Sequence, residues 1–138
     1  MVGRNPSPHL RQKLAHEPAI DLIGWVDDVR PFIARHAVYI VPLRIGGGTR
    51  IKIYEAMAMG KAIVSTPIGA EGLPVEHGRH IWLADEAEPF AEAVIHLLQD
   101  RAARQQVETA AREFVERHCS WDRAAAVFAD ICRQVAEG

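Results

Sequence analysis

The sequence predicts an α/β fold, a three-layer sandwich in which helices cover both faces of a parallel β-sheet. Short apolar, β-branched runs alternate with helical patterns as far as Asp85, and the connections between them are short. Parallel neighbours in a sheet require crossovers of this kind. After Asp85 the pattern is helical alone, so the last third of the chain should consist of helices.

The expected elements follow from local composition and periodicity. Met1, Val2 and Gly3 look like the end of a strand that enters a loop. In chain order we then expect a helix at 8–16, a strand at 19–23, a helix from 27 or 28 to about 36, a strand at 37–43, a helix at 49–59, strands at 61–66 and 80–83, and helices at 88–100, 102–118 and 120–136.

Capping and breaking residues justify several of these boundaries. Asp27 and Asp28 supply an N-cap before Pro31 in the first turn of a helix. Gly60 should end the helix at 49–59, and Ser120 is a suitable N-cap for the last helix. The strand at 37–43 is apolar on both faces, which is typical of a parallel strand covered on both sides.

Composition favours a soluble, cytoplasmic chain with one domain over residues 1–138. The chain is 49% hydrophobic and 25% charged, and its net charge of -2 comes without a basic run, which argues against nucleic acid as a partner. Cys119 and Cys132 have no metal-ligand spacing and are expected to be reduced thiols. No run approaches the roughly 18 apolar residues that span a bilayer, although the protein could work at the inner face of a membrane.

The glycine loop RIGGGTR, residues 44–50, lies where open α/β sheets bind ligands, after a buried strand and before a helix. Glycines let a ligand approach the backbone, and the unpaired N–H groups of the helix start favour an anion such as phosphate. Thr49 could cap the helix or donate to the anion, and Arg50 could add positive charge. A tight turn without a ligand is the alternative interpretation.

Glu55 is the one acid in an otherwise apolar stretch of the helix at 49–59. Because burial of an unpaired carboxylate is costly, such groups are normally paired or functional. Glu55 could lie on an exposed edge and pair with Lys52 or Arg50. It could instead accept hydrogen bonds from the vicinal hydroxyls of a ribose. Phosphate at the helix start and ribose one turn later would describe a bound nucleotide.

The segment PLRIGGGTRIKIYEAMAMGKAIVSTPIGAEGL resembles the donor-binding stretch of the group 1 (family 4) glycosyltransferases of GT-B architecture, with their E-x7-E region and its E-A-M-A-x-G-x-x-V-V-x-T continuation. IGWVDDVRPFIARHAVYIVP and RAARQQVETAAREFVERHCSWDRAA are similar to the family's strand-helix-strand segment and closing helices. The resemblance implies two facing Rossmann-like domains. This chain would correspond to the C-terminal, donor-binding one and would be a fragment without the N-terminal acceptor domain.

The resemblance also implies donor-binding residues, each at the matching position of this chain. They are Glu55 for the ribose, Gly48, Thr49 and Arg50 for the diphosphate and sugar, Gly24, Trp25 and Val26 for the base, and Gly47 in the place of the family's first acid. Because Gly47 has no carboxylate, the donor sugar is not implied. Glu71 and Gly72, after the strand at 61–66, could face the donor or form a plain loop.

The full-length enzyme is thereby expected to transfer a sugar, in polysaccharide biosynthesis, from a nucleotide-diphosphate sugar to a hydroxyl of a glycan or a lipid-linked acceptor. The resemblance implies no metal and no other cofactor, and His77 and His80 are expected to be solvated rather than ligands. No catalytic residue is expected in this fragment, which should bind donor weakly and transfer nothing. A non-catalytic nucleotide-sugar-binding module and a GT-B sugar-nucleotide epimerase are the alternatives.

The last helix carries apolar residues that the rest of this chain need not cover. In a full-length protein of the resembled family it could cross back to the missing domain. Val127, Phe128 and Ile131 would then be partly exposed here. Self-association of the fragment is the expected consequence.

Overall fold

The computed structural model describes residues 1–2 and 5–137, and the chain divides into two compact units, Met1–Arg35 and His36–Gly138. The first unit contains helices α1 (Pro8–Leu14) and α2 (Arg30–Ala34). The second contains the sheet, helices α3 to α6 and the glycine loop. The expectation of one domain over the whole chain stays a prediction.

The strand predicted at 19–23 is wrong. Its place is taken by an extended segment in which the Ile23 N–H donates to the Met1 carbonyl at 2.9 Å, and Val2 forms an isolated parallel bridge with Gly24. A strand needs a ladder of partners, and the described residues supply Met1 and Val2 alone. The predicted strand end at 1–3 is thus seen as this bridge at Val2, while Gly3 lies outside the described residues.

Helix α2 begins later and ends earlier than predicted, and its N-cap is Val29 rather than Asp27 or Asp28. The carboxylate of Asp28 accepts from the backbone N–H and from Nε of Arg30, the first residue of α2, each at 2.9 Å. Asp28 thus binds a free N–H at the helix start, as predicted for a capping residue, although Val29 occupies the N-cap position.

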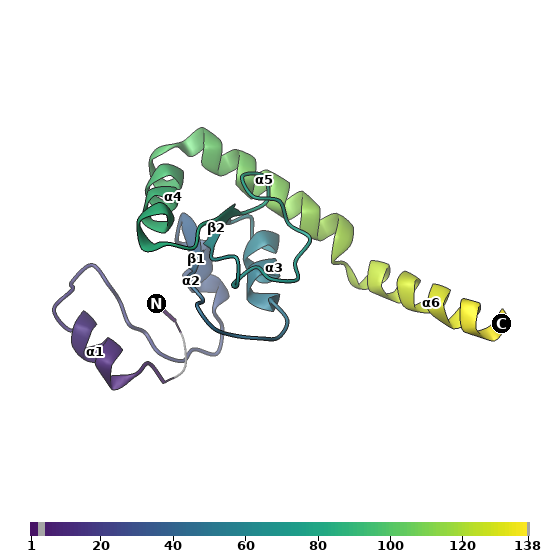
Figure 1. Cartoon of the computed structure of the whole chain (residues 1–138), viewed down its shortest axis with the longest axis horizontal. Helices are drawn as coiled ribbons and strands as arrows, with labels where there is room; N and C mark the ends of the chain where they lie inside the picture. Colours follow the sequence, from purple (N-terminus) through teal and green to yellow (C-terminus); the bar gives the residue numbers. More distant parts are fainter. Residues whose placement is uncertain (3–4, 138) are drawn as a thin grey trace. The chain divides into compact units, whose positions relative to one another are not determined.

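Within the described residues the sheet has three parallel strands in the order β1 (Val38–Val41), β2 (Ala62–Ser65), β3 (Trp82–Leu83). Figure 1 labels β1 and β2 at the centre of the second unit. Val38 pairs with Ala62 and Val64 pairs with Trp82. All three strands are shorter than predicted, but their order and direction confirm the parallel α/β sheet.

Helices cover both faces of this sheet, so the three-layer sandwich is confirmed. They are α3 (Ile51–Ala58), α4 (Ala87–Gln99) and α5 (Arg101–His118), with α6 (Trp121–Glu137) following α5 (Figure 1). Side chains alternate along β2. Ile63 packs with the buried residues of α3 and with Ala111 and Phe114 of α5, whereas Ala62 and Val64 pack with those of α4 and with Val107 of α5. The helical last third of the chain is confirmed as well.

Two predicted helix boundaries are confirmed in this unit. Gly60 follows the C-cap of α3 with a φ of +64°, a left-handed conformation that glycine adopts at low cost. The Ser120 hydroxyl accepts from the Arg123 N–H at 3.2 Å and caps α6. Helix α3, however, begins at Ile51 with Arg50 as its N-cap, so Thr49 does not cap it.

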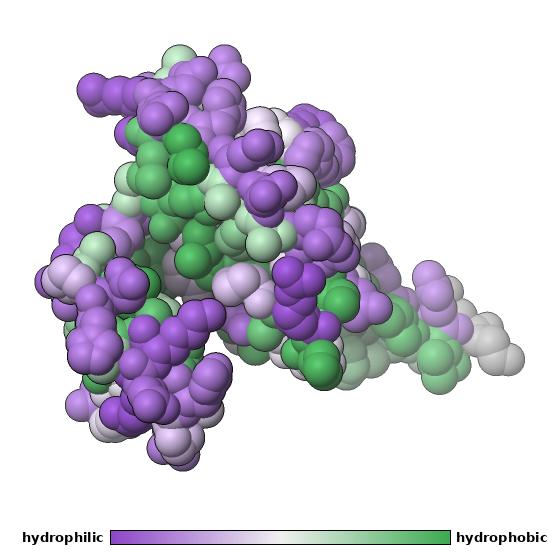
Figure 2. Space-filling model, turned by 60° about the vertical axis from the view of Figure 1, so that its left-hand side comes forward, coloured by the Kyte–Doolittle hydropathy of each residue, from purple (hydrophilic) through white to green (hydrophobic). Residues whose placement is uncertain are grey.

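The side chains of α6 are exposed from residue 121 to residue 136. Hydrophobic and hydrophilic residues alternate along this helix, the arm at the right of Figure 2. The predicted exposure of Val127, Phe128 and Ile131 is confirmed, since they are 44%, 69% and 52% exposed. Within the described residues, no helix has both the length and the apolar character that a membrane crossing requires.

Candidate functional site

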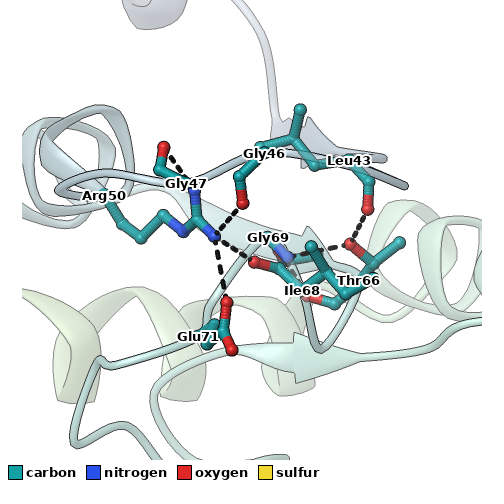
Figure 3. A network of polar contacts seen from close by, with 9 residues as sticks. Leu43, Gly46, Gly47, Arg50, Thr66, Ile68, Gly69 and Glu71 are labelled. Carbon is teal, nitrogen blue, oxygen red and sulfur yellow. Dashed lines mark hydrogen bonds and ion pairs between the residues drawn. The ribbon is translucent and has the colours of Figure 1, made fainter.

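Two loops lie side by side at the carboxyl end of the sheet. The glycine loop connects β1 to α3, and residues 66–72 follow β2. Because β1 and β2 are adjacent and parallel, both loops leave the same edge, and Figure 3 shows polar contacts joining them. This edge is where open α/β sheets bind ligands.

The glycine loop leaves space for a ligand beside Gly47 and Gly48. A Cβ placed on Gly47 or Gly48 would meet no atom within 4 Å, and Gly48 has a φ of +91° that favours glycine. Within the described chain, the N–H groups of residues 47–49 donate to no protein acceptor. Buried amides are nearly always paired, whereas these are exposed and available to a ligand. Thr49 is exposed beside them.

The side chain of Arg50 contacts both loops. Its side chain is 5% exposed, and its Nη2 donates to the carbonyls of Gly46 at 3.1 Å and Ile68 at 2.7 Å. Its Nη1 donates to the carbonyl of Gly47 at 3.3 Å (Figure 3). The guanidinium thus holds the carbonyl side of the glycine loop. Its predicted contact with the diphosphate stays a prediction.

Glu71 approaches the same guanidinium. Its Oε2 lies 3.6 Å from Nη2 of Arg50, and its side chain is 74% exposed. The sequence left Glu71 open between a ligand-facing residue and a plain loop residue. The spacing of the two residues gives no signal for this ion pair, because they lie on loops that only the sheet brings together.

A second set of contacts fixes the loop after β2. The Thr66 hydroxyl donates to the carbonyl of Leu43 and accepts from the Gly69 N–H, the latter at 3.0 Å (Figure 3). The buried Ser65 hydroxyl donates to the Thr66 carbonyl at 2.9 Å. The two bonds of the Thr66 hydroxyl join the loop after β2 to the chain that follows β1.

Glu55 is exposed, which answers why an apolar helix carries one acid. The buried side chains of α3 are Ile53, Ala56 and Met57, and Glu55 points to the other face. On that face it has Ile51 one turn before it, which is 58% exposed. The alternative pairing with Arg50 is wrong, because Arg50 pairs with Glu71. The ribose contact stays a prediction.

The charge of Glu55 affects the pKa of Tyr39 on β1. Burial raises the pKa of Tyr39 above its ordinary 10.0, and the negative charge of Glu55 raises it further.

The three residues predicted to hold the base lie in the first unit. Gly24 has a φ of +83° and bridges Val2, Trp25 is 57% exposed, and Val26 is half-buried. Their role stays a prediction.

The two histidines differ in exposure: His77 is exposed, as expected, whereas His80 is buried. His80 is 6% exposed, so the prediction that it is solvated is wrong, and burial lowers its pKa. Nδ1 of His80 accepts from the Glu76 N–H at 3.1 Å, and Nδ1 of His77 accepts from the Leu83 N–H at 2.9 Å. In the part of the chain that the structure describes, no group of three or more His, Cys, Asp or Glu could hold a metal ion.

A cavity of about 280 Å³ lies elsewhere, between the loop around His80 and helix α5. The arginines that line it are already paired: Arg79 with Glu76 at 3.1 Å and Arg117 with Glu113 at 2.9 Å. The charges of these two arginines are therefore compensated. The glycine-loop edge is the better candidate site.

The model of the family described as glycosyl transferases group 1 matches residues 1–100. The chain is 31% identical over 149 aligned positions to the GDP-mannose-dependent alpha-(1-6)-phosphatidylinositol monomannoside mannosyltransferase of Mycobacterium tuberculosis, covering 96% of this chain and 38% of that protein. It is 27% identical over 100 residues to an uncharacterized 44.6 kDa protein in the cps region of Klebsiella pneumoniae, covering 71% of this chain and 26% of that protein.

Among solved structures, the chain is similar to sucrose-phosphate synthase from Thermosynechococcus elongatus, with a TM-score of 0.80 and 21% identity. The superposition covers 99% of this chain and 38% of that structure. This likeness concerns the fold, and it confirms the Rossmann-like half of a GT-B architecture. The chain spans well under half the length of each of these relatives.

Proposed function

The chain belongs to the group 1 glycosyltransferases, and from this premise we propose that it is the donor-binding domain of an enzyme that transfers a sugar from a nucleotide-diphosphate sugar to an acceptor hydroxyl. One observation of the site supports this most: the amides of residues 47–49 are unpaired at the start of α3, and the exposed carboxylate of Glu55 follows on the same helix.

This spacing suits a nucleoside diphosphate. A helix rises about 1.5 Å per residue, so the Glu55 backbone lies roughly 6 Å beyond that of Ile51. The amides and the helix dipole stabilise the pyrophosphate, and the carboxylate accepts hydrogen bonds from the ribose diol. During transfer the same fixed dipoles would stabilise the leaving nucleoside diphosphate, which is a preorganised electrostatic contribution to catalysis.

The chain spans 38% of the mannosyltransferase that it resembles, so we propose that further parts of the enzyme bind the acceptor. An N-terminal domain would hold a glycan or lipid-linked acceptor, so that this chain alone binds donor weakly and transfers no sugar. A role in polysaccharide biosynthesis is supported by the cps-region relative. The binding module and the epimerase are not favoured, since the relative that aligns with 96% of the chain is a transferase.

The proposed mechanism uses no metal. Developing charge on the leaving diphosphate would be met by backbone amides at the glycine loop rather than by a cation. For the cellular setting we propose the cytoplasm, beside the inner face of a membrane. Cys119 and Cys132 are unpaired thiols, which is the usual state of cysteine in a reducing compartment.

Glu55→Ala should lower the affinity for GDP or UDP about tenfold or more, because the lost hydrogen bonds go to a charged acceptor. The helix should persist, since Glu55 packs against none of the core. Titration calorimetry, or ligand-observed NMR for weak binding, gives the affinity, and circular dichroism gives the helix content. Glu92→Ala, at an exposed position of α4, is the matched control. A wild-type chain that binds neither nucleotide would contradict the proposed function.

We also propose that the isolated chain self-associates through α6. Trp121, Phe128, Ile131 and Val135 recur at helical spacing and are all at least half exposed. Sedimentation velocity at rising concentration should show a dimer or larger species, and Phe128→Asp should shift it to monomer. Gln134→Asp adds the same charge to the helix at a polar position and should leave the association intact. A wild-type chain that is monomeric at all concentrations would reject this proposal.

A further inference from the structure

We propose that Glu71 is a specificity-determining residue of the donor site: its carboxylate accepts hydrogen bonds from hydroxyls of the donor sugar, and Arg50 positions it. The inference rests on the proposed function and extends it from the nucleotide to the sugar. Its basis is the contact of one buried guanidinium with both loops at the sheet edge (Figure 3).

The three glycines of the loop have no side chain with which to select a sugar. Gly46, Gly47 and Gly48 can offer a ligand only backbone groups, and the carbonyls of the first two are bound by Arg50. A sugar attached to a phosphate at these glycines can be selected by the side chains around them: Arg44 and Thr49 are exposed on the same loop, and Glu71 is the exposed acid on the neighbouring one. Nη2 of Arg50 lies 3.1 Å from the Gly46 carbonyl oxygen and 3.6 Å from Oε2 of Glu71. The same nitrogen atom therefore bridges the glycine loop and the Glu71 carboxylate.

The carboxylate also keeps its capacity to bind a ligand. Its 3.6 Å contact with Arg50 is longer than a hydrogen bond, and its side chain is 74% exposed. An ionised carboxylate accepts up to about four hydrogen bonds, and vicinal sugar hydroxyls are matching donors. The ion pair with Arg50 therefore orients the Glu71 side chain and leaves its carboxylate oxygens able to accept hydrogen bonds from a ligand.

The positive charge of Arg50 offsets the repulsion between the Glu71 carboxylate and a bound diphosphate. Two unit charges of like sign at short range repel, so an acid at a phosphate site needs a nearby cation. Arg50 is that cation, and burial together with three carbonyl contacts holds its guanidinium in one place. Arg50 thus acts on the sugar through Glu71 and the loop, which makes it a positioning residue.

The experiment compares nucleotide with sugar nucleotide. Saturation-transfer NMR and titrations of the chain with GDP, GDP-mannose, UDP and UDP-glucose separate ribose protons from sugar-ring protons. For the pair that binds, Glu71→Gln should lower the sugar nucleotide affinity about tenfold, with weaker signals from the sugar ring, and leave the nucleoside diphosphate within about twofold. Glu76→Gln, an exposed glutamate paired with Arg79, is the matched control.

The outcomes are distinct. Equal losses for both ligands, or no loss for either, would overturn the role of Glu71 and leave the proposed function in place. Failure of the wild-type chain to bind GDP and UDP would contradict both. Arg50→Lys keeps the charge but not the forked geometry, so we expect it to weaken binding of the nucleoside diphosphate as well as of the sugar nucleotide, and of the sugar nucleotide more. Thermal melts of each variant establish that it is folded.

Discussion

Arg50→Met is expected to lower the free energy of unfolding by about 3 kcal/mol and nucleoside diphosphate affinity by at least about tenfold. Methionine fills much of the same volume but supplies no donor. The carbonyls of Gly46, Gly47 and Ile68 then lose the guanidinium that joins the two loops. Because the glycine loop is exposed, the Gly46 and Gly47 carbonyls can bind water when the guanidinium is lost. The loss of stability is therefore smaller than the sum of three buried hydrogen bonds. Urea denaturation gives the stability and calorimetry the affinity.

Arg112→Met is the matched control for this substitution. Arg112 lies on α5 and forms a 2.8 Å ion pair with Glu116, but its side chain is 60% exposed. An exposed pair of this kind contributes at most about 1 kcal/mol, so the control should lose little. If the two variants lose the same stability, Arg50 is not the residue that joins the loops. If Arg50→Met keeps full affinity, the loop does not depend on it to present its amides.

The parallel sheet could be predicted, although the order of its strands was not, because the alternation of apolar and helical segments is a local pattern. The residues of β2 are all apolar or small, and Gly60 marks the turn before them, so a buried strand after a capped helix is the simplest reading. The segment at 19–23 has the same local character, yet it forms no strand. A strand depends on partners that lie elsewhere in the chain, and composition does not reveal them.

The candidate site could be predicted in part. The glycine loop and Glu55 were found from the pattern, and the exposure of Glu55 could have been as well. The buried residues Ile53, Ala56 and Met57 recur at helical spacing, and Glu55 falls outside that stripe. The burial of Arg50 could not be predicted. Its acceptor at Ile68 is 18 residues away in sequence, and only the pairing of β1 with β2 brings the two together.

Gly69→Ala is expected to destabilise the chain by about 2 kcal/mol through crowding alone. A Cβ at this position would lie 2.3 Å from the Ser65 hydroxyl, 3.0 Å from the Val41 carbonyl and 3.1 Å from the Thr66 hydroxyl. Ser65 and Thr66 are buried at the ends of the paired strands, so the loop after β2 must move outward. That movement would weaken the bond from the Gly69 N–H to Thr66.

Two further variants decide whether crowding is the cause. Gly47→Ala adds the same methyl group where nothing lies within 4 Å, and its effect on the free energy of unfolding should be close to zero. Ser65→Ala combined with Gly69→Ala removes the nearest clash and should recover part of the loss in urea denaturation. The loop that moves in Gly69→Ala also carries the Ile68 carbonyl and Glu71, which both contact Arg50. Nucleotide affinity should therefore fall together with stability, and a variant as stable as the wild type would show that the two loops are not rigidly joined.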